Sequence, residues 1–330
     1  PFELFLELIQ LLKLPISVIN LILILKKLKP DIIHLNSSVI SSGVIAGWIL
    51  KIPVIWHFRE APPKKYLGFR KFIFKTLMKM TKKCFFISKS NLKEWEGHYN
   101  GEVVYNFINI KKFNSQINKN LYNGDNLKLT FLGGVPKIKG GHVLLKSFIK
   151  AHNNGYKFQN VELNFYGGIF QVPDNFIFSI ATFISSFFNI NKLLPNSILI
   201  NNLIKEIQEK KIIKLNVKSF TNNVAQAIFN SDVIVFPATR PHFARPVIEA
   251  GALKKTVLAS NISGMDEIVV QGKTGYILNF SDYKLLFKYI ENLRDDKFRN
   301  KLGQENFNFV ISNFKLETTT GKILKSYKIH

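Results

Sequence analysis

The stretch that decides the fold is residues 237–278, PATRPHFARPVIEAGALKKTVLASNISGMDEIVVQGKTGYIL. It follows a short apolar run at 233–236 that is typical of a buried strand. Within the stretch, Pro246 opens a helical segment that carries Glu249, and the run at 256–260 predicts a second strand. Strand, loop, helix and strand form the repeating unit of an open parallel sheet. Ligands bind in such sheets beyond the carboxyl ends of the strands, where helix N-termini favour phosphate.

A second motif, FLGGVPKIKGG at 131–141, also follows an apolar run and opens a helical segment. Glycines let backbone N–H groups approach an anion closely, and Lys139 adds a positive charge for phosphate. The motif therefore predicts a phosphate-binding loop. Its candidate residues are Gly133, Gly134, Lys139 and Gly140.

Together the two motifs resemble the donor site of retaining glycosyltransferases of family four, which have the GT-B fold: two facing Rossmann-like α/β domains with parallel sheets. The resemblance covers nearly all of the chain and implies a nucleoside diphosphate sugar as donor. Glu249 matches the second of two glutamates in the family motif and, by that resemblance, would hold the donor ribose. The other donor contacts that the resemblance implies at this motif are His242, Phe243, Ala244 and Arg245.

Donor positions depart from the family pattern in both motifs. Pro241 stands where the first glutamate is expected, and residues 242–244 read HFA where Gly-Phe-Gly is usual. Gly134 occupies the position of an arginine, so the diphosphate loses one expected cation. His242 and Arg245 are the nearest polar candidates for the sugar hydroxyls. We interpret the chain as a variant of the family.

A separate group of polar residues follows two apolar runs in the first part of the chain. Residues 31–36 and 53–58 predict parallel strands joined by a helix at 41–50. The polar residues at the ends of these strands are Asn36, Ser37, Ser38, His57, Arg59 and Glu60. The resemblance implies that this edge contacts the sugars, with His57 as the candidate catalytic residue and the other five as candidate acceptor contacts. A helix N-cap role for the serines and a structural role for His57 are the alternatives.

Two successive sets of strands and helices predict two domains. We expect an acceptor-side domain at 1–118, in which the family's first strand and glycine-rich loop are missing. A nucleotide-sugar-binding domain is expected at 119–315, beginning at a polar linker. By resemblance, the last helix, in 316–330, would cross back to the first domain. The chain starts with Pro, which suggests a truncated reading frame.

The chain is strongly basic, with 46 Lys and Arg against 22 Asp and Glu and a net charge of +24. Such a charge favours an anionic partner, although a lysine-rich gene composition would also produce it. Residues 61–83 carry eight basic residues and no acidic one, which predicts a basic amphipathic helix on an anionic membrane surface. A core-facing helix with a solvated basic side is the alternative. The candidate membrane contacts are Arg70, Lys71, Lys75, Lys79 and Lys82.

An aromatic-rich segment, FIFSIATFISSFF at 176–188, is too short to span a bilayer and predicts a buried or inserted helix, with interfacial contact as the alternative. Residues 1–25 are apolar but interrupted by charges, and Pro15 is expected to break any helix there, so no secretory signal or membrane span is predicted. The single cysteine, Cys84, excludes an internal disulfide framework and predicts a buried thiol in a reducing cytoplasm.

No Asp-x-Asp or His-Glu-x-x-His motif occurs, so we expect neither a metal nor any cofactor besides the donor substrate. No motif for nucleic acid is present, and no nucleic-acid partner is expected. The sequence thus predicts a retaining, metal-independent hexosyltransferase acting on a glycan or lipid-linked acceptor. It would serve cell-surface polysaccharide or glycolipid synthesis, at the cytoplasmic face of the membrane.

Two other classes of function remain open at this point. The first is a catalytically inactive GT-B-fold protein that binds membrane or nucleic acid, which the departures at Gly134 and Pro241 favour. The second is another GT-B enzyme, such as a sugar epimerase, which would need acid and base carboxylates in its cleft.

Overall fold

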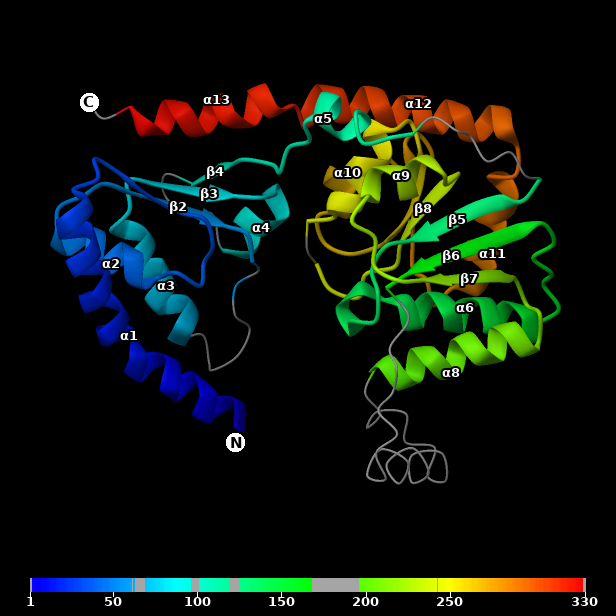
Figure 1. Cartoon of the computed structure of the whole chain (residues 1–330), viewed down its shortest axis with the longest axis horizontal. Helices are drawn as coiled ribbons and strands as arrows, with labels where there is room; N and C mark the ends of the chain where they lie inside the picture. The colour runs from blue at the N-terminus through cyan, green and yellow to red at the C-terminus, as the bar shows by residue number, and fades with distance from the viewer. Residues whose placement is uncertain are drawn as a thin grey trace. The chain divides into compact units, whose positions relative to one another are not determined.

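The computed structural model describes the backbone of residues 2–60, 62, 69–95, 101–118, 125–167, 196–241 and 243–328, and the side chains of these residues except 2–13 and 69–71. The chain divides into two compact units, Pro1–Phe107 with Leu316–His330, and Ile108–Lys315. We call them unit 1 and unit 2 (Figure 1). The division falls after Phe107, whereas the sequence analysis places the domain boundary at 118. Most of the expected linker at 119–126 lies outside the described residues.

Unit 1 contains a parallel sheet in the order β1-β2-β3-β4. Its strands are β1 (Ile33–Leu35), β2 (Val54–Phe58), β3 (Lys83–Phe86) and β4 (Gly101–Val103). Every residue of β2 is buried, as expected for a strand covered on both faces. Cys84 lies on β3 and is 1% exposed, which confirms the prediction of a buried thiol.

Helices cover both faces of this sheet (Figure 1). They are α1 (Phe2–Leu28), α2 (Ser42–Ile49), α3 (Phe69–Lys79), α4 (Lys89–Glu94) and α13 (Leu316–Tyr327). Side chains alternate along a strand, so Trp56 and Phe58 pack toward α2, α3 and α4, while Ile55 packs on the other face with α13. The last helix of the chain therefore contributes to the core of unit 1.

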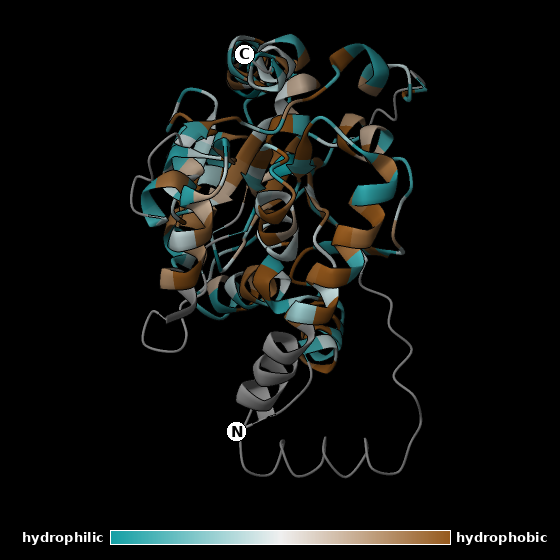
Figure 2. Cartoon of the chain, turned by 90° about the vertical axis from the view of Figure 1, so that its left-hand side faces the viewer, coloured by the Kyte–Doolittle hydropathy of each residue, from teal (hydrophilic) through white to brown (hydrophobic). Residues whose placement is uncertain are grey.

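The prediction that Pro15 breaks any helix is wrong, because Pro15 lies inside the 27-residue helix α1. A proline inside a helix removes one backbone hydrogen bond and costs about 3 kcal/mol. The other hydrogen bonds of a long helix and the burial of Val18 offset that loss. None of the described helices combines the length and the apolar character that crossing a membrane requires. In Figure 2 the helices of unit 1 carry polar and apolar residues side by side.

Unit 2 contains a parallel sheet in the order β10-β9-β8-β5-β6-β7. The strands are β5 (Leu127–Phe131), β6 (Val161–Tyr166), β7 (Lys214–Lys218), β8 (Val233–Phe236), β9 (Thr256–Ser260) and β10 (Gly275–Leu278). From β5 the chain builds outward to β6 and β7, and then returns to place β8 on the other side of β5. This reversal of strand order is the topological switch point at which open α/β sheets bind ligands.

The helices of unit 2 cover both faces of this sheet (Figure 1). They are α5 (Ile110–Asn114), α6 (Gly141–Asn153), α8 (Asn196–Glu209), α9 (Val224–Phe229), α10 (Arg245–Ala252), α11 (Tyr283–Asn292) and α12 (Asp296–Asn313), with 3-10 turns η1 (Lys137–Lys139) and η2 (Met265–Glu267). Residues of α6, α8 and α11, among them Phe148, Ile200 and Leu286, form one core with the sheet. Helices α10 and α12 pack closely, because Gly251 leaves room for Val310 and Asn306 of α12.

Candidate functional site

The two motifs singled out in the sequence leave the two strands that flank the switch point of unit 2. The glycine loop follows β5, and the loop at 237–244 follows β8, its hydrogen-bonded neighbour. In both cases the loop leaves the carboxyl end of its strand and enters a helix, α6 or α10. The structure therefore brings together, at one sheet edge, segments that lie about a hundred residues apart in the sequence.

Backbone contacts tie the two loops to each other. The Thr239 N–H group donates to the carbonyl oxygen of Ile138 at 3.0 Å, and its hydroxyl donates to that of Lys137 at 3.1 Å. Gly140 has φ +77°, and a Cβ atom there would overlap the carbonyl oxygen of Pro237. Only glycine fits this left-handed position and this close approach. The glycine at position 140 is thus required by the contact between the loops.

A small cavity of about 20 Å³ lies where the glycine loop meets the start of α10. Its lining residues are Phe131, Leu132, Gly133, Lys139, Val235, Phe236 and Pro246. Lys139 is half buried, and burial lowers the pKa of its ammonium group. Gly134 has φ +64°, and its N–H group donates to the carbonyl oxygen of Tyr166 on β6. Lys139 and the first turn of α10 therefore border one space.

Helix α10 carries an ion pair across its first turn. The Nε atom of Arg245 donates to Oε1 of Glu249 at 2.8 Å. The Arg245 side chain is 75% exposed, whereas that of Glu249 is 9% exposed. Burial raises the pKa of Glu249 above its ordinary value, and Arg245 offsets this only in part. A carboxylate kept in such surroundings is typical of a functional site.

The remaining donor candidates lie in the segment that leads into α10. Ala244 is completely buried, and it is the N-cap residue of α10 without a side-chain capping bond. The Phe243 ring contacts that of Phe314 with the centroids 6.3 Å apart. His242 lies outside the described residues. The sugar-binding roles of these three residues stay predictions.

In unit 1, the Glu60 carboxylate closes a network at the carboxyl ends of β1 and β2. Its oxygens accept from the Ser37 hydroxyl at 2.6 Å, and from the Ser38 hydroxyl and N–H group at 2.7 and 2.9 Å. Burial alone would raise the pKa of Glu60, but these hydrogen bonds outweigh it and hold the pKa below its ordinary value. The carbonyl oxygen of Glu60 also accepts from Asn91 and Trp95. Glu60 thereby fixes the loop after β1 and contacts α4 through Asn91 and the C-cap residue Trp95.

Arg59 lies at the same edge and is held by two amides. Its Nε donates to Oδ1 of Asn36 at 2.8 Å, and its Nη1 donates to Oδ1 of Asn106 at 2.6 Å. Asn106 follows β4 and was missed as a site residue from the sequence. The rule that found Asn36, a polar residue just beyond a predicted strand, would also have indicated Asn106.

His57 is the candidate that the structure separates from this polar edge. It is 2% exposed and lies on the face of the sheet that α13 covers, 6.0 Å from the His34 ring and 5.8 Å from the Phe85 ring. Burial, followed by the charges of Arg59 and His34, lowers the pKa of His57 to about 3, so the imidazole is neutral. Among the described residues, neither of its ring nitrogens has a hydrogen-bond partner. A catalytic role for His57 stays a prediction.

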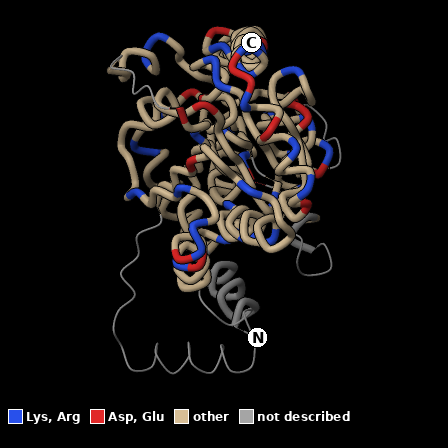
Figure 3. The backbone as a smooth tube through the Cα atoms, turned by 90° about the vertical axis from the view of Figure 1, so that its right-hand side faces the viewer, with Lys and Arg blue, Asp and Glu red and all other residues tan. Residues whose placement is uncertain are grey.

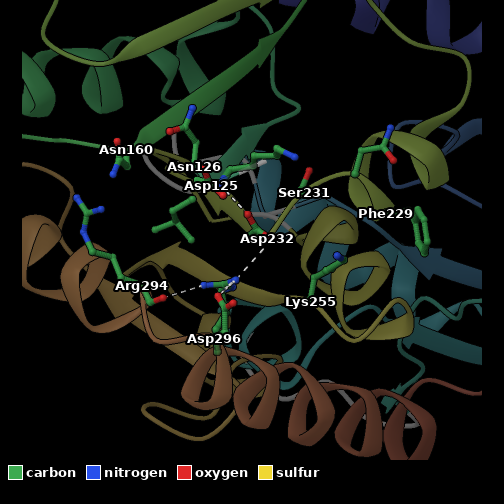
Figure 4. Close-up of a pocket in the computed structure, with 13 residues that line it drawn as sticks. Asp125, Asn126, Asn160, Phe229, Ser231, Asp232, Lys255, Arg294 and Asp296 are labelled. Carbon is green, nitrogen blue, oxygen red and sulfur yellow. Dashed lines mark hydrogen bonds and ion pairs between the residues drawn. The ribbon is translucent and has the colours of Figure 1, made fainter. Parts of the chain in front are cut away.

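A larger cavity, of about 450 Å³, lies at the opposite end of the unit 2 sheet, where β5, β8 and β9 begin (Figure 4). Its arginines are already paired. Arg299 contacts Asp296 at 2.5 Å and Asp232 at 3.7 Å, and Arg294 contacts Glu291 at 2.8 Å. The Arg299–Asp232 pair joins α12 to the segment before β8, away from the glycine loop, whereas the other two pairs are local to α12 and to the end of α11. The cavity is separate from the predicted donor site.

Helix α3 turns much of its apolar surface inward. Phe74, Leu77 and Met78 are buried in unit 1, whereas Phe72 is 66% exposed. Lys82, beyond the helix, donates to the carbonyl oxygen of Lys328. The side chains of Arg70 and Lys71 lie outside the described residues, as does the segment 176–188. This arrangement matches the alternative of a core-facing helix with a basic outer side, and membrane contact stays a prediction.

In the part of the chain that the structure describes, no cluster of three or more His, Cys, Asp or Glu side chains could hold a metal ion. Positive charge is abundant instead. Figure 3 shows Lys and Arg spread over the described backbone of the side in view, and not gathered in one patch.

Comparison with known proteins identifies the family. Residues 112–309 match the family described as "Glycosyl transferases group 1", and residues 5–112 match the family described as "Glycosyltransferase Family 4". The chain belongs to the glycosyl transferases of group 1. It is 29% identical, over 87% of its length and 73% of the relative's, to the capsular polysaccharide biosynthesis glycosyltransferase CapM of Staphylococcus aureus.

A second relative is the UDP-Gal:alpha-D-GlcNAc-diphosphoundecaprenol alpha-1,3-galactosyltransferase of Escherichia coli, 22% identical over 97% of this chain and 80% of that protein. Among solved structures, Anabaena HepE in complex with UDP and glucose superposes with a TM-score of 0.73 at 16% identity, covering 94% of this chain and 80% of that one. These comparisons confirm the predicted GT-B fold and the assignment of this group 1 chain as a glycosyltransferase.

Proposed function

We propose that the protein transfers a hexose from a nucleoside diphosphate sugar to a glycan or lipid-linked acceptor, with retention at the anomeric carbon. The observation that carries this proposal is the convergence of the glycine loop and α10 at the switch point of unit 2. Each segment by itself is a common feature of α/β proteins. Their meeting beside β5 and β8 places Lys139 next to the first turn of α10, the helix that carries the buried Glu249.

Each of these groups has a distinct task in the proposed reaction. Lys139 and the first turn of α10 neutralise the negative charge that develops on the departing diphosphate. Glu249 accepts hydrogen bonds from the ribose hydroxyls, for which a carboxylate with free lone pairs is suited. Lys137, within the glycine loop, and Arg245, at the start of α10, replace the arginine that Gly134 displaces. With these cations the site needs no metal ion for the leaving group.

The relatives support the choice of donor and of pathway. HepE was solved with UDP and glucose, and CapM is named for capsular polysaccharide biosynthesis. The relative from Escherichia coli is named for an acceptor linked to diphosphoundecaprenol. We therefore propose cell-surface polysaccharide or glycolipid synthesis as the process, with the protein peripheral at the cytoplasmic face of the membrane. The net charge of +24 favours such an anionic surface.

The experiment is a transfer assay with a panel of nucleotide sugars. Release of nucleoside diphosphate is measured with and without lipid-linked and free glycan acceptors, and the anomeric configuration of the product is read by NMR. The proposal predicts acceptor-dependent release and a product with the anomeric configuration of the donor. An inverted product, or a free epimerised sugar, would contradict it.

A further inference from the structure

Arg59 is a charged side chain held in place by neutral partners. Its guanidinium donates to the amide oxygens of Asn36 and Asn106 at 2.8 and 2.6 Å. These two residues follow β1 and β4, and Arg59 itself follows β2. Three strand ends of unit 1 thus fix the orientation of one solvent-exposed guanidinium.

The neighbouring carboxylate does not neutralise this charge by direct contact. The Glu60 oxygens are occupied by three donors from Ser37 and Ser38. Among the described residues, no carboxylate forms an ion pair with Arg59. Burial lowers the pKa of Arg59, and the charge of the adjacent Glu60 raises it. Arg59 therefore keeps a full positive charge at the carboxyl edge of the sheet.

The guanidinium also retains donors for a ligand. It has five N–H groups, of which the two hydrogen bonds to Asn36 and Asn106 use two. The other three have no hydrogen-bond partner among the described residues. A guanidinium presents its donors as a planar fork that matches two oxygens of a phosphate group. Because its neighbours have already fixed it, it loses little conformational entropy when an anion binds.

We propose that Arg59 binds a phosphate group of the acceptor, and that the acceptor is a saccharide linked to a lipid through a diphosphate. This inference rests on the proposed function and decides between its two acceptor classes. The hydroxyl groups of a neutral glycan can accept single hydrogen bonds from a guanidinium, but they carry no negative charge and no pair of phosphate oxygens to match its charge and its planar fork. The donor diphosphate already has its own cations in unit 2, with Lys139 and Arg245. The acceptor is the remaining source of an anionic group.

The test compares Arg59→Gln with Lys51→Gln. Lys51 is exposed and precedes β2, so its replacement removes the same charge at the opposite end of the same strand. Three acceptors with the same terminal sugar are used: a prenyl diphosphate saccharide, a neutral alkyl glycoside and a glycoside that contains a uronic acid. We expect Arg59→Gln to lower kcat/KM for the diphosphate acceptor at least tenfold and for the other two less than twofold. Lys51→Gln should leave all three unchanged.

Two further measurements separate this inference from the proposed function. Acceptor-independent hydrolysis of the nucleotide sugar and affinity for nucleoside diphosphate should be the same in Arg59→Gln and wild type. Arg59→Lys should restore activity only in part, because an ammonium group lacks the planar fork. If wild type transfers no sugar, calorimetry with geranyl diphosphate, after saturation with nucleoside diphosphate, still tests the contact.

Several results would overturn the inference. An equal loss with all three acceptors would assign Arg59 to the stability of the sheet edge, and thermal unfolding would reveal it. A loss confined to the uronic acid acceptor would show that Arg59 recognises a carboxylate and not a phosphate group. Weaker nucleotide binding in Arg59→Gln would show that Arg59 contacts the donor. Unchanged binding of geranyl diphosphate in Arg59→Gln would show that Arg59 does not contact a phosphate group of the acceptor.

Discussion

Arg245 and Glu249 form an ion pair across one turn of α10, with Nε of Arg245 2.8 Å from Oε1 of Glu249. The two side chains of the pair differ in exposure, because the arginine is exposed and the glutamate is buried. Burial raises the pKa of Glu249 in spite of the arginine, so the folded state holds a carboxylate that its surroundings disfavour. A protein retains such a group where the group has a task other than stability.

Replacing Glu249 by Gln should therefore separate stability from binding. The pKa of Glu249 is raised on folding, so its contribution favours the folded state below the unfolded pKa and is lost as the pH rises through the folded pKa. At pH 7 the variant should be at least as stable as wild type. Its affinity for the nucleotide sugar should fall by about 1.5 to 3 kcal/mol, as for hydrogen bonds to a charged group. Calorimetry and thermal unfolding measure both, and unchanged affinity would contradict the assignment to the ribose.

Replacing Lys139 by Ala should lower turnover far more than stability. A lysine in a loop contributes little to folding, so the free energy of unfolding should change by less than about 1 kcal/mol. Loss of a charge that stabilises the transition state lowers kcat by a factor on the order of 100 or more. Steady-state kinetics at saturating donor provide the measurement. Turnover close to wild type would assign the role to Lys137 or Arg245 instead.

Gly140 should tolerate no side chain. Gly140→Ala places a Cβ against the carbonyl oxygen of Pro237, at a backbone conformation with φ +77°. Gly155→Ala is the matched control, because Gly155 has φ +86° and nothing within 4 Å. The control should lose about 1 to 2 kcal/mol of unfolding free energy from backbone strain alone. The Gly140 variant should lose clearly more in urea unfolding and should also bind nucleotide less well. Equal losses in the two variants would show that the approach of the two loops is unimportant.

His57 should make unit 1 sensitive to acid. Its pKa falls on folding to about 3 because of burial, so the unfolded chain binds the proton more readily. The contribution of His57 to the free energy of unfolding is fully present above its unfolded pKa of about 6.5 and declines as the pH falls toward 3.

The variant His57→Phe keeps a ring in the same place but cannot be protonated. Between pH 7 and pH 4, wild type should lose about 2 to 3 kcal/mol more stability than this variant. Parallel pH dependences, measured by urea unfolding, would indicate that His57 is protonated without opening the structure.

The donor half of the site was predictable because its signals are local. Continuous apolar runs predicted strands β5 and β8, and the glycines and Pro246 predicted where the loops between strand and helix lie. That these two segments belong to one site was implied by the resemblance to family four, and the strand order of the structure explains why they touch. The helical segment predicted after the glycine motif and the strand predicted at 256–260 agree with α6 and β9.

The acceptor half was predicted less completely. Strand β4 ends at Val103, so Asn106 lies beyond it and contacts Arg59. Alternation along β2 puts Trp56 and His57 on opposite faces, and His57 is buried on the face that α13, more than 250 residues later, covers. Such contacts between distant segments leave no pattern in the sequence around either residue.

The most direct test of the central claim is a crystal structure of the protein with a bound nucleoside diphosphate. The account predicts the diphosphate at the glycine loop, with a phosphate oxygen within hydrogen-bond distance of Lys139 Nζ, and the ribose hydroxyls at the Glu249 carboxylate. A nucleotide bound instead in the larger cavity beside Asp232 and Lys255, at the other end of the sheet, would contradict the donor site described above.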